Sequence, residues 1–272
     1  MKENKLKTRE SGHKAVAVAA LVAFAAAAAV LVFAYGRLKD LWLEQCVVTD
    51  VASQVQISDG RMVRADVIAL EFGLKNGANL ALIDFAERRR EVLKKIPNIR
   101  NITISRHLPN RVSISVEERV PVVRLGIKGR KDSSGRVADA DGVVFISSNG
   151  TQMLPTINEA ATAVTTKGNK LGGLALSALR LIETCREKFP ELGFIVVDAT
   201  KPDYISAVLR DYTLAKIAWP GMEDPSDAMM PVLTERLEGP WKAVSSNVDK
   251  GIRTWNATQD GPVYGNTERS FL

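Results

Sequence analysis

The chain has 272 residues, of which 46% are hydrophobic and 25% charged, and its formal net charge is +6 at pH 7. These values are ordinary for a folded chain and predict one or two domains. Five basic and two acidic residues lie in the first fourteen positions, and the remaining positive charge is spread thinly. This distribution argues against a nucleic-acid-binding surface, which would cluster its charge on a folded face.

The first predicted element is a transmembrane helix at 15–35, preceded by a basic tail at 1–14. The segment has no charged residue, and a helix of its length spans roughly 31 Å, which matches the bilayer core. Eleven of its residues are alanine and nine are Val, Leu or Phe. The expected insertion preference is therefore only about 3 to 5 kcal/mol. Basic residues are more frequent before the segment than after it, which predicts a cytoplasmic tail and an exported remainder.

A cleaved signal peptide is the alternative to this membrane anchor. The alanine run offers small-residue cleavage sites. Cleavage there would leave the apolar stub VLVFAY at 30–35 as the new N-terminus. We therefore expect the segment to stay uncleaved.

A small α+β domain is predicted at 46–118, after a short helical continuation or linker at 36–45. Its first expected elements are a strand within Cys46–Ile57, a turn at Asp59-Gly60, a helix over Arg64–Phe72 and a helix from Asp84 to Lys95. Gly73 and Gly77 stop the first helix, Asp84 caps the second and Pro97 ends it.

After Pro97 the apolar period changes from that of a helix to that of a strand. Ile102 and Ile104 alternate with polar residues, as do Val112, Ile114 and Val116. The sequence His107-Leu108-Pro109-Asn110 between them predicts a tight turn. The resulting order is strand, helix, helix, strand, strand, with two helices covering one apolar face of the sheet.

A mostly-β domain with two helices is predicted at 119–265, followed by a tail at 266–272. The expected strands are Val122–Ile127, Val143–Ser147, Phe194–Asp198, Tyr204–Leu209, Leu214–Trp219, Gly251–Asn256 and Gly261–Gly265. One helix carries the stripe Leu174, Ala178, Leu181, Cys185 and Phe189, and the other carries Met230, Leu233 and Leu237. Ser226 is expected to cap the second helix.

No arrangement of residues predicts catalysis or metal binding. His13 and His107 cannot pair usefully, because the first lies in the predicted tail and the second in the hairpin turn. Asp139, Asp141 and Gly142 suit a turn better than a calcium loop, which needs more regularly spaced oxygen ligands. No nucleophile elbow, P-loop, zinc-protease or dinucleotide motif is present in the sequence.

Two smaller interpretations concern charge and thiols. Glu117-Glu118-Arg119 could be an acid pair, but we expect local ion pairs made by Glu118 and Arg119 where one domain ends. Cys46 and Cys185 fall in different predicted domains. Cys185 lies on the apolar side of its helix, so a buried free thiol is expected there.

With these segments placed, the chain resembles the FtsQ/DivIB family of bacterial cell-division proteins. The resemblance rests on Ile96-Pro97 with Ile99, Arg106-x-Leu108-Pro109-Asn110, Ile114-x-Val116-x-Glu118-Arg119-x-Pro121, Asp141-Gly142-x-Val144-Phe145 and Leu154-Pro155. It covers the basic tail, one membrane helix, a POTRA domain and a β-domain. The family's last strand signature is replaced here by Arg253-Thr254-Trp255-Asn256.

The resemblance implies a non-enzymatic scaffold of the inner membrane at the division septum, without cofactors. Its implied partners are FtsB-like and FtsL-like coiled-coil proteins, the first of which adds a strand to the C-terminal β-domain. An added strand would satisfy the unpaired backbone groups of a terminal strand. The expected contact residues are Arg253, Trp255, Val263 and Tyr264. Trp255 and Tyr264 have the size of interface anchors, and the alternative is that they only pack the last hairpin.

Two other functional classes stay open. POTRA domains also occur in proteins of outer-membrane assembly and secretion, but those usually precede a long β-barrel, for which this chain has no room. A cell-wall enzyme would need paired acids, a nucleophile or a metal set, none of which is convincing in this sequence.

Overall fold

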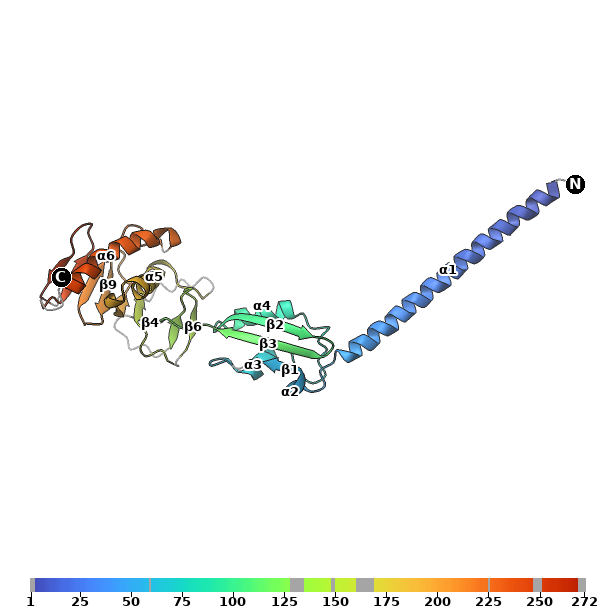
Figure 1. Cartoon of the computed structure of the whole chain (residues 1–272), viewed down its shortest axis with the longest axis horizontal. Helices are drawn as coiled ribbons and strands as arrows, with labels where there is room; N and C mark the ends of the chain where they lie inside the picture. The colour runs from blue at the N-terminus through green and yellow to red at the C-terminus, as the bar shows by residue number, and fades with distance from the viewer. Residues whose placement is uncertain are drawn as a thin grey trace. The chain divides into compact units, whose positions relative to one another are not determined.

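A computed structural model describes residues 3–58, 60–127, 135–147, 150–159, 169–224, 226–246 and 251–268 (Figure 1). Asp59 of the first predicted turn and the end of the predicted C-terminal tail lie outside these ranges. The chain divides into two compact units. The first comprises 1–60, 64–92 and 102–116, and the second comprises 61–63, 93–101 and 117–272.

The N-terminal helix α1 runs without interruption over Glu3–Gln45 (Figure 1). The segment predicted as a continuation or linker at 36–45 is therefore a helical continuation. Within α1, Ala19–Gln45 is long and apolar enough to cross a membrane. Its large apolar side chains, such as Leu31 and Phe33, are about 70% exposed to the surroundings. These side chains have the exposure expected of a lipid-facing helix.

The elements that follow α1 have the predicted order, with one addition. They are α2 Val51–Gln54, β1 Val55–Ile57, α3 Ala65–Glu71, α4 Phe85–Lys95, β2 Ile99–His107 and β3 Arg111–Glu118. The strand expected within Cys46–Ile57 is found only at its end, because Val51–Gln54 form α2 instead. The carboxylate of Asp50 accepts a hydrogen bond from the N–H of Ala52 and caps α2, which leaves only three residues for β1.

The sheet formed by these strands has the order β1-β3-β2, with β1 parallel to β3. Ile102, Val112 and Ile114 are at most 2% exposed, as their alternation predicts. The predicted cap of α4 is confirmed, because Asp84 accepts hydrogen bonds from the N–H groups of Ala86 and Glu87, both at 3.0 Å.

Within the described residues, the second unit contains a nine-stranded sheet of order β12-β11-β10-β9-β8-β7-β4-β5-β6. Its strands are β4 Val123–Ile127, β5 Arg136–Ala138, β6 Val144–Ile146, β7 Thr156–Glu159, β8 Phe194–Asp198, β9 Ile205–Leu209, β10 Leu214–Ile217, β11 Thr254–Ala257 and β12 Tyr264–Asn266. The sequence did not predict β5 or β7, which are short and lack a clear alternation. The neighbouring pairs β4–β7, β7–β8 and β10–β11 are parallel, and the other neighbouring pairs of this sheet are antiparallel.

Helices α5 Gly173–Lys188 and α6 Met230–Ser246 (Figure 1) contribute buried residues to the hydrophobic core of this unit. The predicted stripe of α5 is buried at Ala178, Leu181 and Cys185. These residues pack with the buried alternate residues of the strands, such as Ile205 and Leu209 of β9. The sheet therefore has one face in the hydrophobic core with α5 and α6.

The start of α6 differs from the prediction. A short 3₁₀ turn at Asp227–Met229 lies between Ser226 and α6. The hydroxyl of Ser226 is 3.2 Å from a carboxylate oxygen of Asp224. Ser226 is therefore not the cap of α6, because one more turn of chain separates the two.

Of the ion pairs predicted for Glu118 and Arg119, the structure has the one made by Arg119. Arg119 pairs with Asp139 at 2.6 Å, with side chains that are 16% and 7% exposed. The carboxylate of Glu118 instead accepts three backbone hydrogen bonds, from the N–H groups of residues 61, 62 and 63. Asp139 also accepts hydrogen bonds from the N–H groups of Asp141 and Val143, which confirms the predicted turn.

A candidate partner-binding edge strand

The last two strands, β11 and β12, form a hairpin at one end of the sheet, and the connection at 258–263 has no helix or strand. β11 lies parallel to β10, with Ala215 opposite Trp255. β12 runs antiparallel to β11, with Gly265 opposite Trp255 and Tyr264 opposite Asn256. Among the strands that the structure describes, β12 has a neighbour on one side only. Its outer edge is therefore available for a further strand.

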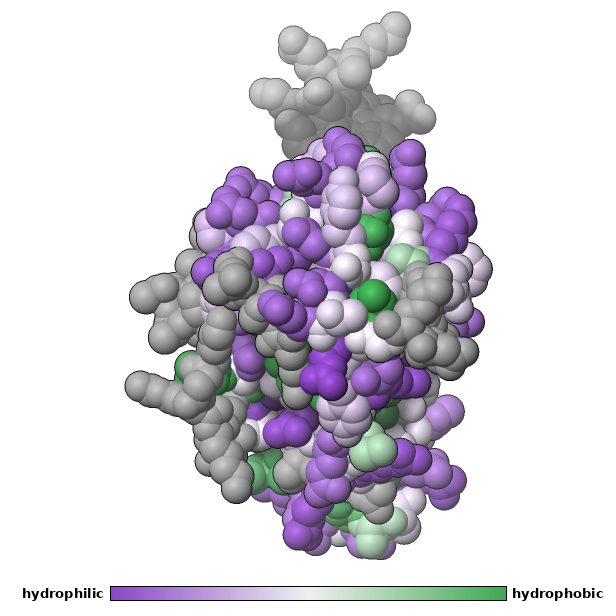
Figure 2. All heavy atoms as spheres, turned by 90° about the vertical axis from the view of Figure 1, so that its left-hand side faces the viewer, coloured by the Kyte–Doolittle hydropathy of each residue, from purple (hydrophilic) through white to green (hydrophobic). Residues whose placement is uncertain are grey.

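The surface around this end of the sheet is mostly hydrophilic. Figure 2 shows the left-hand side of Figure 1, where hydrophobic residues are scattered among hydrophilic ones. All three residues of β12 are exposed. A partner that docks here would thus meet exposed backbone and single apolar side chains more than a broad apolar patch.

The four predicted contact residues have different positions in this hairpin. The side chain of Arg253 is exposed, while its N–H donates to the carbonyl of Asn266 at 2.8 Å and its carbonyl accepts from Leu214 at 2.9 Å. Tyr264 is 62% exposed. Val263 is half-buried and packs against the core. Arg253 and Tyr264 are thus the two that present most of their side chain to solvent.

Trp255 is a core residue, which is the packing alternative to a surface anchor. It is 5% exposed and belongs to the hydrophobic cluster beneath α5 and α6. A Cβ atom at Gly265 would lie 3.1 Å from Cζ3 of its ring, so the glycine leaves the space that the indole occupies. The indole Nε1 is buried and has no hydrogen-bond partner among the described residues. Trp255 therefore supports the hairpin from inside.

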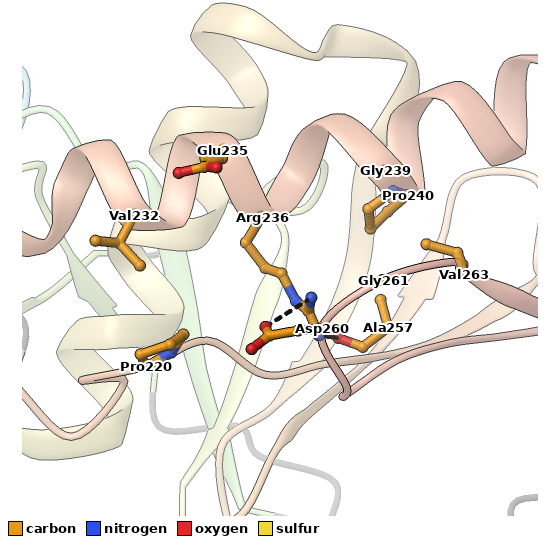
Figure 3. A pocket seen from close by; sticks show the side chains of 10 residues that line it. All are labelled: Pro220, Val232, Glu235, Arg236, Gly239, Pro240, Ala257, Asp260, Gly261 and Val263. Atoms are coloured by element: carbon orange, nitrogen blue, oxygen red, sulfur yellow. Dashed lines mark hydrogen bonds and ion pairs between the residues drawn. The ribbon is translucent and has the colours of Figure 1, made fainter.

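A groove of about 430 Å³ lies between α6 and the chain that joins β11 to β12 (Figure 3). Its α6 side includes Val232 and Pro240, and its other side includes Asp260 and Val263. Arg236 crosses the groove from α6, and a dashed line in Figure 3 joins it to Asp260. A charged side chain of α6 thus reaches the chain that follows β11 within this groove.

Sequence reasoning missed two residues of this region, Arg236 and Gly265. Arg236 lies three residues after Leu233 and one before Leu237, so it occupies a position on the apolar stripe of α6. A charged residue on such a stripe is the signal that could have indicated a buried polar contact. No comparable signal marks Gly265, because its role depends on the strand that lies opposite.

Two titratable side chains of the second unit, Cys185 and Glu183, have a raised pKa. Burial raises the pKa of the Cys185 thiol to about 12, so it is protonated and inert at neutral pH. Burial also raises the pKa of Glu183, although the nearby Arg186 acts in the opposite direction. Within the described parts of the chain, no three His, Cys, Asp or Glu side chains are grouped as a metal site requires.

Comparison with protein families identifies a known domain in this chain. The family profile described as POTRA domain, FtsQ-type, matches residues 52–119. No curated protein matches the chain at a significant level. The matched range contains β1, α3, α4, β2 and β3, whose order is the one described above.

Proposed function

Because an N-terminal apolar helix followed by an FtsQ-type POTRA domain fits the FtsQ/DivIB family, we propose that this chain is a non-enzymatic scaffold of the divisome. It would link early and late division proteins in the inner membrane during septum formation. The FtsQ-type POTRA domain supports a division-related family, and the apolar helix supports a membrane anchor. The domain boundaries that we propose are those expected from the sequence, with the POTRA domain at 46–118 and the β-domain at 119–265.

The proposed topology places residues 1–14 in the cytoplasm and the two domains in the periplasm. The greater number of basic residues before the membrane segment supports this orientation. Fusions of alkaline phosphatase after residue 272 and of a fluorescent protein before residue 1 test it. Active phosphatase with a fluorescent N-terminal fusion is expected, and the opposite pattern would reject the orientation.

The single observation that carries the proposed binding mode is the position of β12 at the end of the sheet. A segment of an FtsB-like partner would add to this edge and pair with its free N–H and C=O groups. Arg253 and Tyr264 would contact the side chains of the added strand, and Val263 would contact its flank. Trp255 would hold β11 in place from the core. An FtsL-like protein is the second proposed partner of the β-domain.

Photo-crosslinking tests this contact at the level of one residue. A photoreactive phenylalanine at position 264 is expected to capture an FtsB-like protein in dividing cells. Position 212 is a matched control, because Tyr212 is 69% exposed and Tyr264 is 62% exposed in the same unit. Capture at 212 but not at 264, or at neither position, would reject the edge of β12 as the partner site.

Localisation tests the functional class separately from the site. A fluorescent fusion is expected to form a band at midcell before septation. An even signal over the cell envelope would favour the class of outer-membrane assembly proteins. Hydrolysis of purified cell wall by the full chain would favour an envelope enzyme.

A further inference from the structure

Arg236 of α6 is an enclosed arginine that bonds to the connection between β11 and β12. Its side chain is 12% exposed, whereas Asp260, the carboxylate that faces it, is 93% exposed. An exposed carboxylate contributes little to holding a buried cation, because water screens the pair. The partners that matter must therefore be other acceptors.

Those acceptors are backbone carbonyls from separate pieces of chain. Nε of Arg236 donates to the carbonyl of Ala218 at 2.8 Å, and Nη2 donates to that of Ala257 at 2.9 Å. Nη2 also donates to the carbonyl of Gln259, and Nη1 lies 3.3 Å from Oδ1 of Asp260. The guanidinium thus uses all three of its nitrogens, and Figure 3 shows the contact with Asp260.

These contacts connect α6 to the places where two strands end. Ala218 directly follows β10, Ala257 is the last residue of β11, and Gln259 lies in the connection to β12. A planar guanidinium can bond several acceptors at once in a fixed geometry, whereas a lysine ammonium acts as a single point charge. One side chain therefore fixes the path of the chain from β11 into β12.

The hairpin needs such a contact because β12 is short. It has three residues, and in the described part of the chain it pairs with β11 alone. A short edge strand with so few hydrogen bonds opens readily, and opening destroys the template that an added strand requires. A template that is already ordered binds more tightly, because less entropy is lost on binding.

We propose that Arg236 is a positioning residue that holds the connection between β11 and β12, and thereby keeps the edge of β12 ready for an added strand. The binding step rests on the proposed function, whereas the ordering of β12 does not. The charge pair with Asp260 is secondary, and the bonds to the backbone carbonyls carry the effect.

Hydrogen–deuterium exchange of the full chain in detergent micelles tests the ordering. In Arg236→Met, exchange over residues 257–266 is expected to be about tenfold faster, with a change below about twofold over β8 and β9. Arg236→Lys keeps the charge but is expected to restore less than half of the protection. Asp260→Asn and the control Lys242→Met, on the exposed side of α6, are expected to leave exchange unchanged.

Several results would overturn the proposal. They are unchanged exchange at 257–266 in both Arg236 variants, an equal acceleration over β8 and β9, or full protection in Arg236→Lys. If Arg236→Met does not accumulate, Arg236→Lys carries the same measurement. Crosslinking from position 264 is then repeated in the Arg236→Lys background, where reduced capture is expected. No capture in either background, with faster exchange in the variant, would reject the partner site while leaving the role of Arg236 intact.

Discussion

The buried ion pair between Arg119 and Asp139 leads to a quantitative prediction about stability. The two side chains are 16% and 7% exposed and their charged atoms are 2.6 Å apart. Neutralising one partner leaves the other charge buried without its counterion, which typically costs about 3 to 5 kcal/mol. In Asp139→Asn the amide oxygen can still accept from the backbone N–H of Val143, but the amide nitrogen then faces Nη1 of Arg119, so the variant removes both the charge and its hydrogen bond.

We expect this variant to lie at the lower end of that range, at about 3 kcal/mol. The carboxylate of Asp141 is 3.9 Å from the same nitrogen of Arg119 and is 53% exposed, so it retains part of the compensation. The control is Lys242→Met in the same unit, which removes a pair at 3.7 Å whose side chains are 67% and 55% exposed. Its expected cost is about 0.3 to 0.5 kcal/mol.

The assay is guanidinium unfolding of the full chain in detergent micelles, followed by tryptophan fluorescence. Trp219 and Trp255, 7% and 5% exposed, report on the unfolding of the second unit. A double variant, Arg119→Met with Asp139→Asn, should lose less stability than the sum of the single variants, because no buried charge is left alone. Equal costs for Asp139→Asn and Lys242→Met would refute the reasoning from burial.

Three further predictions concern other positions in the second unit. Burial raises the pKa of Cys185 to about 12, so its thiol should not react with a thiol reagent at pH 8 before the protein unfolds. The contribution of this thiol to the free energy of unfolding should be lost as the pH rises from about 9 toward 12. Burial raises the pKa of Glu183, so Glu183→Gln should be at least as stable as wild type at pH 7 in the same unfolding assay. This difference in stability should vanish below about pH 4.5, because the carboxyl is then protonated in both the folded and the unfolded state. Gly142→Ala should cost about 2 to 3 kcal/mol and Gly251→Ala about 1 to 2 kcal/mol in thermal unfolding. Both glycines have positive φ, but only a Cβ at Gly142 would meet another side chain, 3.0 Å away at Leu176; equal costs would exclude this contact as a cause.

The sequence by itself determined the local elements of this protein. The apolar run of α1, the helical stripes of α4 and α5 and the alternation of β2 and β3 predicted their elements because each pattern repeats over several turns or pairs. The family resemblance likewise rests on local motifs around the β2–β3 turn. The FtsQ-type POTRA profile at 52–119 covers these motifs as far as Arg119.

Strand pairing was decided only by the tertiary structure. β5 and β7 have three and four residues, too few for a period to stand out, and their places in the sheet come from partners far along the chain. The parallel pair β10–β11 joins strands that are separated by the whole of α6. This pairing leaves β12 at the edge of the sheet, which no local pattern could predict.

The division of roles at the candidate site depends on the same long-range pairing. Sequence alone left Trp255 and Tyr264 as equivalent aromatic residues of the last hairpin. Because alternate residues of a strand face opposite sides, the register that sets Gly265 against Trp255 buries the indole and turns Tyr264 outward. The contacts of Arg236 arise in the same way, since its carbonyl partners are brought to α6 only when β10 and β11 lie side by side.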